Sequence, residues 1–199
     1  MTLFEKKVTE ISINHSEFII LGLISEEREG DHAYNINKKI KARGMRSWTN
    51  IGRSSVYRVI KNLEEKGLAI TWIEEIDNRS INKFKLTDQG IEVLKAKVFN
   101  VINEFVGRDD KDFYVAFSML PILTTEQLIK GFSNSINLMN KHKKELEEML
   151  DENSRTPLNV RGLFIHPIRI IQTDIEFLEM VLKEIKKGDG YSESKTPSK

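Results

Sequence analysis

The chain has 199 residues, of which 39% are hydrophobic and 31% charged, a composition typical of one sizeable globular domain or two small ones. It contains no cysteine, which excludes disulfides, thiolate metal sites and cysteine nucleophiles and suits a reducing compartment. Residues 1–10 are charged and lack a signal-peptide core, and no stretch approaches the roughly 20 apolar residues of a membrane span. We therefore expect a cytoplasmic protein with no membrane partner.

The net charge of +1 conceals an uneven distribution. Residues 32–63 contain no acidic side chain and eight basic ones: Lys38, Lys39, Lys41, Arg43, Arg46, Arg53, Arg58 and Lys61. Such a segment gives a local positive potential inside a near-neutral protein. A basic run is often only a solvated face, so its meaning depends on the elements that carry it.

Two helices are predicted near the start of the chain. Ser16 is a suitable N-cap, and the residues after it, up to Ser25, are apolar on nearly every side, which predicts a short buried helix. The next helix has an apolar edge that includes Ile36 and Ile40 and a basic outer face, and it ends at Gly44.

A third helix is predicted after a linker at residues 45–52. It begins at Arg53 and is closed by Gly67 as a C-cap. Its apolar residues recur at the spacing of one buried stripe: Val56, Val59, Ile60 and Leu63. The opposite face carries polar residues: Ser54, Tyr57, Arg58 and Lys61.

A β-hairpin and a fourth helix follow. Residues 68–76 and 81–86 alternate in the manner of strands, and a polar turn at 77–80 separates them. The fourth helix, capped by residues 87–90, has the apolar spacing of a helix that packs along another helix: Ile91, Leu94, Val98, Val101 and Phe105. The predicted order is therefore helix, helix, helix, hairpin, helix.

Beyond a break at residues 107–110, the pattern predicts a short helix at 113–120 and two long ones. The long helices keep heptad seams, on the first at Ile129, Phe132, Ile136, Met139, Leu146 and Leu150 and on the second at Phe164, Ile168, Ile171, Ile175, Leu178, Leu182 and Ile185. Because seams this narrow leave little volume for a core, they favour a partner chain. The expected dimerisation residues are Phe132, Ile136, Met139, Ile168, Ile171, Ile175, Leu178 and Leu182.

The predicted fold is mostly α with a small β-hairpin. Residues 1–106 would form an N-terminal winged helix-turn-helix, residues 107–187 a C-terminal all-helical dimerisation domain, and residues 188–199, which lack periodicity, a disordered tail. A winged helix-turn-helix places one helix in the DNA major groove while its hairpin touches the flanking backbone or minor groove. The third helix would be the reader.

The expected DNA-binding residues are Tyr34, Lys38, Arg53, Ser54, Ser55, Tyr57, Arg58, Lys61, Arg79, Lys83 and Lys85. An arginine such as Arg58 can contact guanine in a bidentate way, and the helix start suits a phosphate. Lysines of the second helix, at 38, 39 and 41, would anchor the DNA backbone. The serines could equally serve only as caps, and the charged hairpin could serve only to prevent edge pairing.

Four segments resemble PadR-family transcriptional regulators. Residues 55–68, which read SVYRVIKNLEEKGL, are similar to the recognition-helix signature of that family, and residues 20–25, 32–36 and 83–90 are similar to its first helix, the start of its second helix and the end of its wing. The resemblance covers residues 17–105 closely and extends loosely to the C-terminal helices. Ala33 replaces a usual glycine, and Arg58 stands where a proline commonly follows the tyrosine, so a contact role carries over most safely to Tyr57.

The resemblance implies a homodimer that binds double-stranded DNA at a palindromic operator, usually as a repressor that a signal releases. Half-sites would lie one helical turn apart. Some relatives hold flat apolar ligands on aromatic side chains at the dimer interface, so a small-molecule effector is possible but unidentified. The two tryptophans, Trp48 and Trp72, are more simply explained by packing between the wing and the helices.

Two other classes of function fit the sequence less well. An enzyme is not expected, because the four histidines, His15, His32, His142 and His166, are scattered and no catalytic set, phosphate-binding glycine loop or metal-ligand spacing is present. His166, beside Pro167, is expected at the start of the last helix, and no cofactor or metal is expected. The alternative is a winged-helix protein-interaction module in a hetero-oligomeric helical assembly, but such a module does not need an acid-free basic segment.

Overall fold

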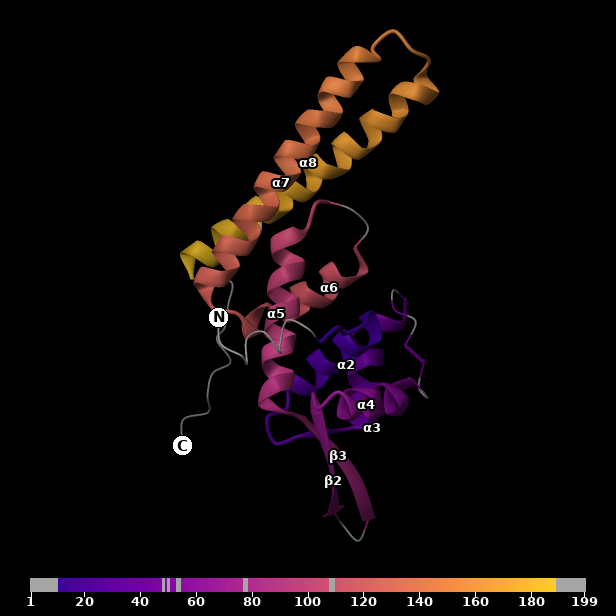
Figure 1. Ribbon diagram of the computed structural model, residues 1–199, viewed down its shortest axis with the longest axis vertical. Coiled ribbons are helices and arrows are strands. Elements are labelled where there is room, and N and C mark those ends of the chain that lie inside the picture. The colour runs from indigo at the N-terminus through magenta and orange to yellow at the C-terminus, as the bar shows by residue number, and fades with distance from the viewer. Residues whose placement is uncertain are drawn as a thin grey trace. The chain divides into compact units, whose positions relative to one another are not determined.

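The structure is a computed structural model that describes residues 11–47, 49, 51–52, 55–76, 79–107 and 110–188. It divides into two compact units, residues 1–97 and 98–199 (Figure 1). The domain limits expected from the sequence, with a change at residue 106, stay a prediction, and the expected tail lies outside the described residues except for Gly188. None of the helices described is both long and apolar enough to cross a membrane.

The first unit has the predicted order of three helices, a hairpin and a helix. These elements are α2 (His15–Ser25), β1 (Asp31–His32), α3 (Ala33–Ala42), the 3-10 turn η1 (Met45–Ser47), α4 (Ser55–Glu65), β2 (Ala69–Ile76), β3 (Arg79–Leu86) and α5 (Asp88–Glu104). The α5 helix continues past residue 97 into the second unit. The fold is mostly helical with a small antiparallel sheet, as the sequence predicted.

The α2 helix is the buried centre of the first unit. Its residues from Glu17 to Ile24 are all buried, and it contacts α4, α3 and β3. The expected N-cap at Ser16 is wrong, because Asn14 caps the helix instead. Its Oδ1 accepts from the Glu17 backbone N–H at 3.0 Å, and Glu17 Oε2 accepts from the Asn14 N–H at 2.9 Å, a capping box that satisfies two donors at once.

The sheet has three strands in the order β1-β3-β2, one more than the sequence predicted. The β2 and β3 strands form the hairpin, with Thr71 opposite Phe84. On the other side of β3, the two residues of β1 pair with Phe84 and Lys83. The wing is therefore hydrogen-bonded to the residues that lead directly into α3.

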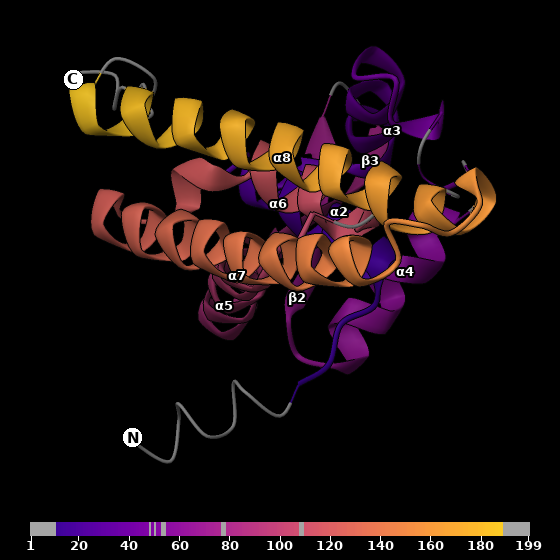
Figure 2. The ribbon, with the colours of Figure 1, turned by 90° about the horizontal axis from the view of Figure 1, so that it is seen from above.

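The second unit contains a long helical hairpin. Its elements beyond α5 are α6 (Lys111–Ser118), the 3-10 turn η2 (Leu120–Ile122), α7 (Thr125–Glu152) and α8 (Leu158–Lys187). Figures 1 and 2 both show α7 and α8 side by side. A capping box between Thr124 and Gln127 starts α7.

The start of the last helix differs from the prediction. The α8 helix begins at Leu158, directly after Pro157, and Pro167 lies inside it, so His166 is a mid-helix residue and does not lie at the helix start. Proline has no backbone N–H to donate, so the helical hydrogen bond to the carbonyl of Leu163 is missing.

Candidate nucleic-acid interface

The α4 helix separates an apolar face from a polar one. Its four predicted core residues are buried: Val56, Val59, Ile60 and Leu63. On the opposite face Tyr57 is 59% exposed, and Arg58 and Lys61 are also exposed. Lys61 Nζ lies 3.9 Å from Glu65, one turn away on the exposed surface of the helix.

The start of α4 is only partly described. Arg53 and Ser54 lie outside the described residues, and Ser55, the first residue of the helix, is half-buried. The expected phosphate contacts at this helix start therefore stay predictions.

The α3 helix, which contacts α4, adds an exposed aromatic ring and exposed charge. Tyr34 is 77% exposed, and Lys38 and Lys41 point to solvent. The helix starts at His32, whose Nδ1 accepts from the Asn35 N–H at 3.1 Å. This cap needs a neutral imidazole, because a protonated Nδ1 cannot accept a hydrogen bond.

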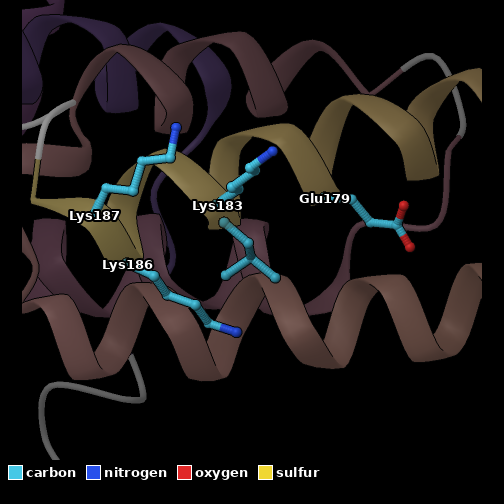
Figure 3. A pocket seen from close by; sticks show the side chains of 5 residues that line it. Glu179, Lys183, Lys186 and Lys187 are labelled. Atoms are coloured by element: carbon cyan, nitrogen blue, oxygen red, sulfur yellow. The ribbon is translucent and has the colours of Figure 1, made fainter.

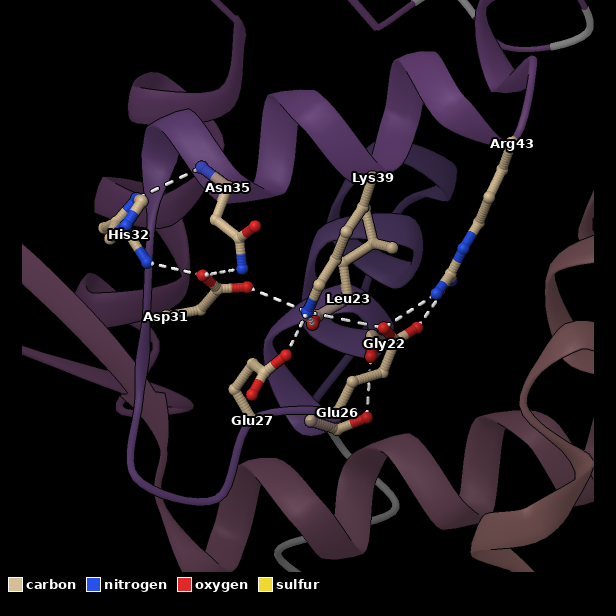
Figure 4. A network of polar contacts seen from close by, with 10 residues as sticks. Gly22, Leu23, Glu26, Glu27, Asp31, His32, Asn35, Lys39 and Arg43 are labelled. Atoms are coloured by element: carbon tan, nitrogen blue, oxygen red, sulfur yellow. Dashed lines mark hydrogen bonds and ion pairs between the residues drawn. The ribbon is translucent and has the colours of Figure 1, made fainter. Parts of the chain in front are cut away.

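Lys39 is not part of this exposed charge. Its side chain is 14% exposed, and its Nζ lies 2.9 Å from Asp31, 3.0 Å from Glu27 and 3.4 Å from Glu26 (Figure 4). Burial lowers the pKa of Lys39, but hydrogen bonds to Asp31 and Glu27 and the nearby negative charges outweigh burial and raise it overall. We conclude that Lys39 already has its counter-ions within the fold.

Arg43 is also paired. Its guanidinium donates to both oxygens of Glu26, at 2.6 and 2.9 Å, and this hydrogen bonding raises its pKa. Of the basic residues between 32 and 63, these two are neutralised by acids that lie just upstream, at positions 26, 27 and 31. The positive charge of residues 32–63 is therefore partly neutralised in the folded protein, although the segment itself contains no acid.

The wing carries two exposed cations and one paired cation. Arg79 and Lys85 are exposed on β3. Lys83 is largely covered, and its Nζ lies 2.6 Å from Glu74 on the neighbouring strand. The free positive charge of the described part of the wing thus comes from Arg79 and Lys85.

Most of the expected dimerisation residues are buried within the chain. Six of them have side chains that are at most 8% exposed: Phe132, Met139, Ile171, Ile175, Leu178 and Leu182. The other two, Ile136 and Ile168, are half-buried. Most of these residues are therefore already covered within the chain, and their contact with a second chain stays a prediction.

A different set of apolar side chains is exposed on the hairpin: Leu138, Met149, Leu158, Leu163, Ile170, Phe177 and Met180. Leu163, Ile170 and Phe177 recur every seven residues and share one face of α8. No residue of α7 after Met139 is buried, and none of α8 before Ile171. The distal part of the hairpin therefore has no buried core of its own.

The surface has two open hollows that are large enough for a small ligand. One, of about 550 Å³, lies near the end of α8 and is lined by Glu179, Leu182, Lys183, Lys186 and Lys187 (Figure 3). Its charged residues are exposed, and Lys187 pairs with Glu184 and lowers the pKa of that carboxyl by a hydrogen bond. The other, of about 540 Å³, lies between the start of α2 and α4 and includes Arg58.

Neither hollow includes a tryptophan. Trp72 packs over Gly30, and Trp48 lies outside the described residues. Within the described part of the chain, no three His, Asp or Glu side chains are arranged to hold a metal ion. The exposed faces of α3, α4 and the wing are thus the strongest candidate site.

Part of the chain is similar to known proteins. No curated protein matches the sequence. Among solved structures, the chain is similar to PadR of Bacillus subtilis in complex with operator DNA, at 16% identity and a TM-score of 0.40, over 86% of this chain and 99% of that one. Residues 20–96 match the model of the transcriptional regulator PadR-like family. This segment runs from α2 into α5 and contains the winged helix-turn-helix.

Proposed function

We propose that the chain is a DNA-binding transcriptional regulator that acts in the cytoplasm as a homodimer on a palindromic operator, most simply as a repressor. The observation that carries this proposal is the polar face of α4, where Tyr57, Arg58 and Lys61 are exposed directly opposite a buried apolar stripe. A helix anchored in this way can enter the major groove while its core face stays packed.

The contacts divide by role. Arg58 would read a base edge, and Tyr57 would contact a phosphate or a base. Tyr34, Lys38 and Lys41 on α3, together with Arg79 and Lys85 on the wing, would bind the sugar-phosphate backbone. We leave Lys39 and Lys83 out of this set because both are held by carboxylates.

The dimer would form on the exposed face of α8. A second copy that packs against Leu163 and Ile170 would cover apolar surface that the chain leaves in water, and it would complete a four-helix arrangement with the two hairpins. Two-fold pairing would present two α4 helices to half-sites one helical turn apart.

DNA binding is tested by mobility shift with the DNA upstream of the protein's own coding sequence. We expect Arg58→Ala to weaken binding by about 1–3 kcal/mol and to relax the preference for one base pair. Lys61→Ala should weaken binding to every sequence and reduce the salt slope by about one. Lys144→Ala, an exposed lysine on α7, serves as the control and should bind normally. Full binding by Tyr57→Ala and Arg58→Ala would exclude α4 as the reading helix.

The dimer is tested by sedimentation of the double variant Leu163→Glu with Ile170→Glu, which places charge on the exposed face. We expect it to sediment as a monomer while Arg169→Glu, a neighbouring exposed substitution on α8, sediments as the wild type does. A wild-type chain that is monomeric at micromolar concentration would contradict the proposed assembly.

A protein-interaction module is the second candidate, and one observation favours it. Ile70 and Ile73 on β2 are 46% and 67% exposed. Apolar side chains do not bind phosphate, so a wing that contacts only the DNA backbone does not explain them. DNA affinity that falls steeply with salt supports the regulator, and absence of any salt-dependent binding supports the module.

A further inference from the structure

The segment from Gly30 to His32 joins the wing to the helix-turn-helix. Trp72 of β2 packs over Gly30, and the backbones of Asp31 and His32 pair with β3. His32 is then the N-cap of α3. Both strands of the wing are thus attached where α3 begins.

Asp31 fixes this junction from inside. Its side chain is 2% exposed, and both oxygens have partners. Oδ1 accepts from the His32 backbone N–H and from the Asn35 side-chain amide, each at 2.8 Å. Oδ2 accepts from Lys39 Nζ at 2.9 Å. These donors keep the Asp31 side chain in one position, because a buried carboxylate that loses a donor is left with unsatisfied charge.

Lys39 ties the same carboxylate to two helices. It projects from the third quarter of α3, and besides Asp31 it reaches Glu27 and Glu26, directly after α2, and the Leu23 carbonyl at 3.5 Å. Figure 4 shows its ammonium among these groups. To reach a DNA phosphate it would have to leave three carboxylates, whereas its neighbours Lys38 and Lys41 are already exposed.

We propose that Lys39 is a positioning residue for DNA binding, which holds the wing at a fixed angle to α3 and α4 through Asp31 and β1. It sets the affinity of the wing contacts without touching DNA. This inference rests on the proposed function. It adds that Lys38 binds DNA directly and Lys39 does not, although the sequence alone does not distinguish these adjacent lysines.

A double-mutant cycle tests the coupling. We expect Lys39→Met to weaken operator binding roughly five- to thirtyfold, and to lose most of that effect in a background that carries Arg79→Ala and Lys85→Ala, because the wing then has no contacts to misplace. Lys38→Ala is the matched control, and it should weaken binding equally in both backgrounds. A loss for Lys39→Met that is the same in both backgrounds would overturn the inference.

The salt dependence gives a second readout. A lysine that binds phosphate contributes about one unit to the slope of log affinity against log salt. Lys38→Ala should therefore reduce the slope by about one, and Lys39→Met should leave it unchanged. A reduced slope for Lys39→Met would show that Lys39 contacts DNA and would overturn the inference.

Hydrogen exchange tests the positioning role without DNA. In Lys39→Met the amides of residues 82–86 should exchange faster, while those of α5 between residues 91 and 97 keep their protection. Unchanged exchange in β3 would overturn the inference alone. A wild-type chain that binds no DNA in the mobility shift would overturn the proposed function, and with it the inference. Should Lys39→Met fail to fold, the double variant Asp31→Asn with Lys39→Gln, which keeps hydrogen-bonding groups and removes both charges, takes its place in all three measurements.

Discussion

The indole of Trp72 lies directly against the Cα of Gly30. A Cβ atom on Gly30 would overlap Cη2 of that ring and lie 2.9 Å from its Cζ2, and the backbone φ of Gly30 is +94°, in the region that side chains disfavour. Only glycine allows the wing to approach so closely. This contact also explains why Trp72 is half-buried on a strand whose neighbours are mostly exposed.

Gly30→Ala should therefore destabilise the protein in two ways. The positive φ costs about 1–2 kcal/mol, and the overlap with the ring adds about 1–3 kcal/mol. Gly44→Ala is the control, because Gly44 has φ +60° but a Cβ there would meet no atom within 4 Å. Urea unfolding should show the larger loss for Gly30→Ala, and equal losses would contradict the packing role of Trp72.

The ion pair between Glu17 and Lys66 should stabilise the first unit. Glu17 is 2% exposed, and its Oε2 lies 2.7 Å from Lys66 Nζ, which also donates to the Ser12 carbonyl. Lys66→Met leaves a buried carboxylate with less compensation, so we expect a loss of about 1–3 kcal/mol. Lys61→Met removes an exposed pair at 3.9 Å and should cost less than about 0.5 kcal/mol. Chemical denaturation that ranks the two variants the other way would rule out this assignment.

In the second unit, α7 satisfies the last carbonyls of α5. The fully buried Ser135 donates from Oγ to the Ile102 carbonyl at 2.7 Å, and the Asn134 amide donates to the Asn103 carbonyl at 2.9 Å. Ser135→Ala leaves a carbonyl unsatisfied and should cost about 1–2 kcal/mol. Ser133→Ala, two residues away, should change stability by less than about 0.5 kcal/mol. If thermal unfolding shows the same midpoint for both variants, the hydrogen bond contributes nothing.

The sequence predicted an element correctly where apolar residues recur at one regular spacing along its whole length. The stripe from Val56 to Leu63 fixed which face of α4 is buried, because apolar spacing alone decides that orientation. The sequence did not predict features that are too short to show a regular spacing. The strand β1 has only two residues, too few to show alternation. The true N-cap, Asn14, lies two residues before Ser16, which was predicted as the cap because it directly precedes the apolar residues.

Two other features needed the folded chain. The acids at 26, 27 and 31 lie in a polar break of the sequence, and only the turn between α2 and α3 brings them to Lys39. Likewise, a heptad seam shows that a helix has a partner but does not show whether the partner belongs to the same chain. Here α7 and α8 pack against each other, and the exposed face of α8 at Ile170 was not singled out from the sequence.

Asp174 gives the second unit a dependence on pH. It lies half-buried on α8 beside Gly107, and burial raises the pKa of its carboxyl above the ordinary value. A raised pKa in the folded state favours folding only while the group is protonated. That contribution is complete below the unfolded pKa of about 3.9 and is lost as the pH rises through the folded value.

Asp174→Asn should consequently stabilise the protein at pH 7, where the wild-type carboxylate is ionised and partly desolvated. Solvent screening at a half-buried site keeps the gain below about 1 kcal/mol. The gain should shrink as the pH falls and vanish below about pH 3.9, where both chains carry a neutral side chain at this position. Urea unfolding of both chains between pH 3 and pH 7, with Glu179→Gln on the same helix as the reference for a change at an exposed acid, measures this difference. A variant less stable than the wild type at pH 7 would mean that the Asp174 carboxylate makes a stabilising contact, and that burial is not its main interaction.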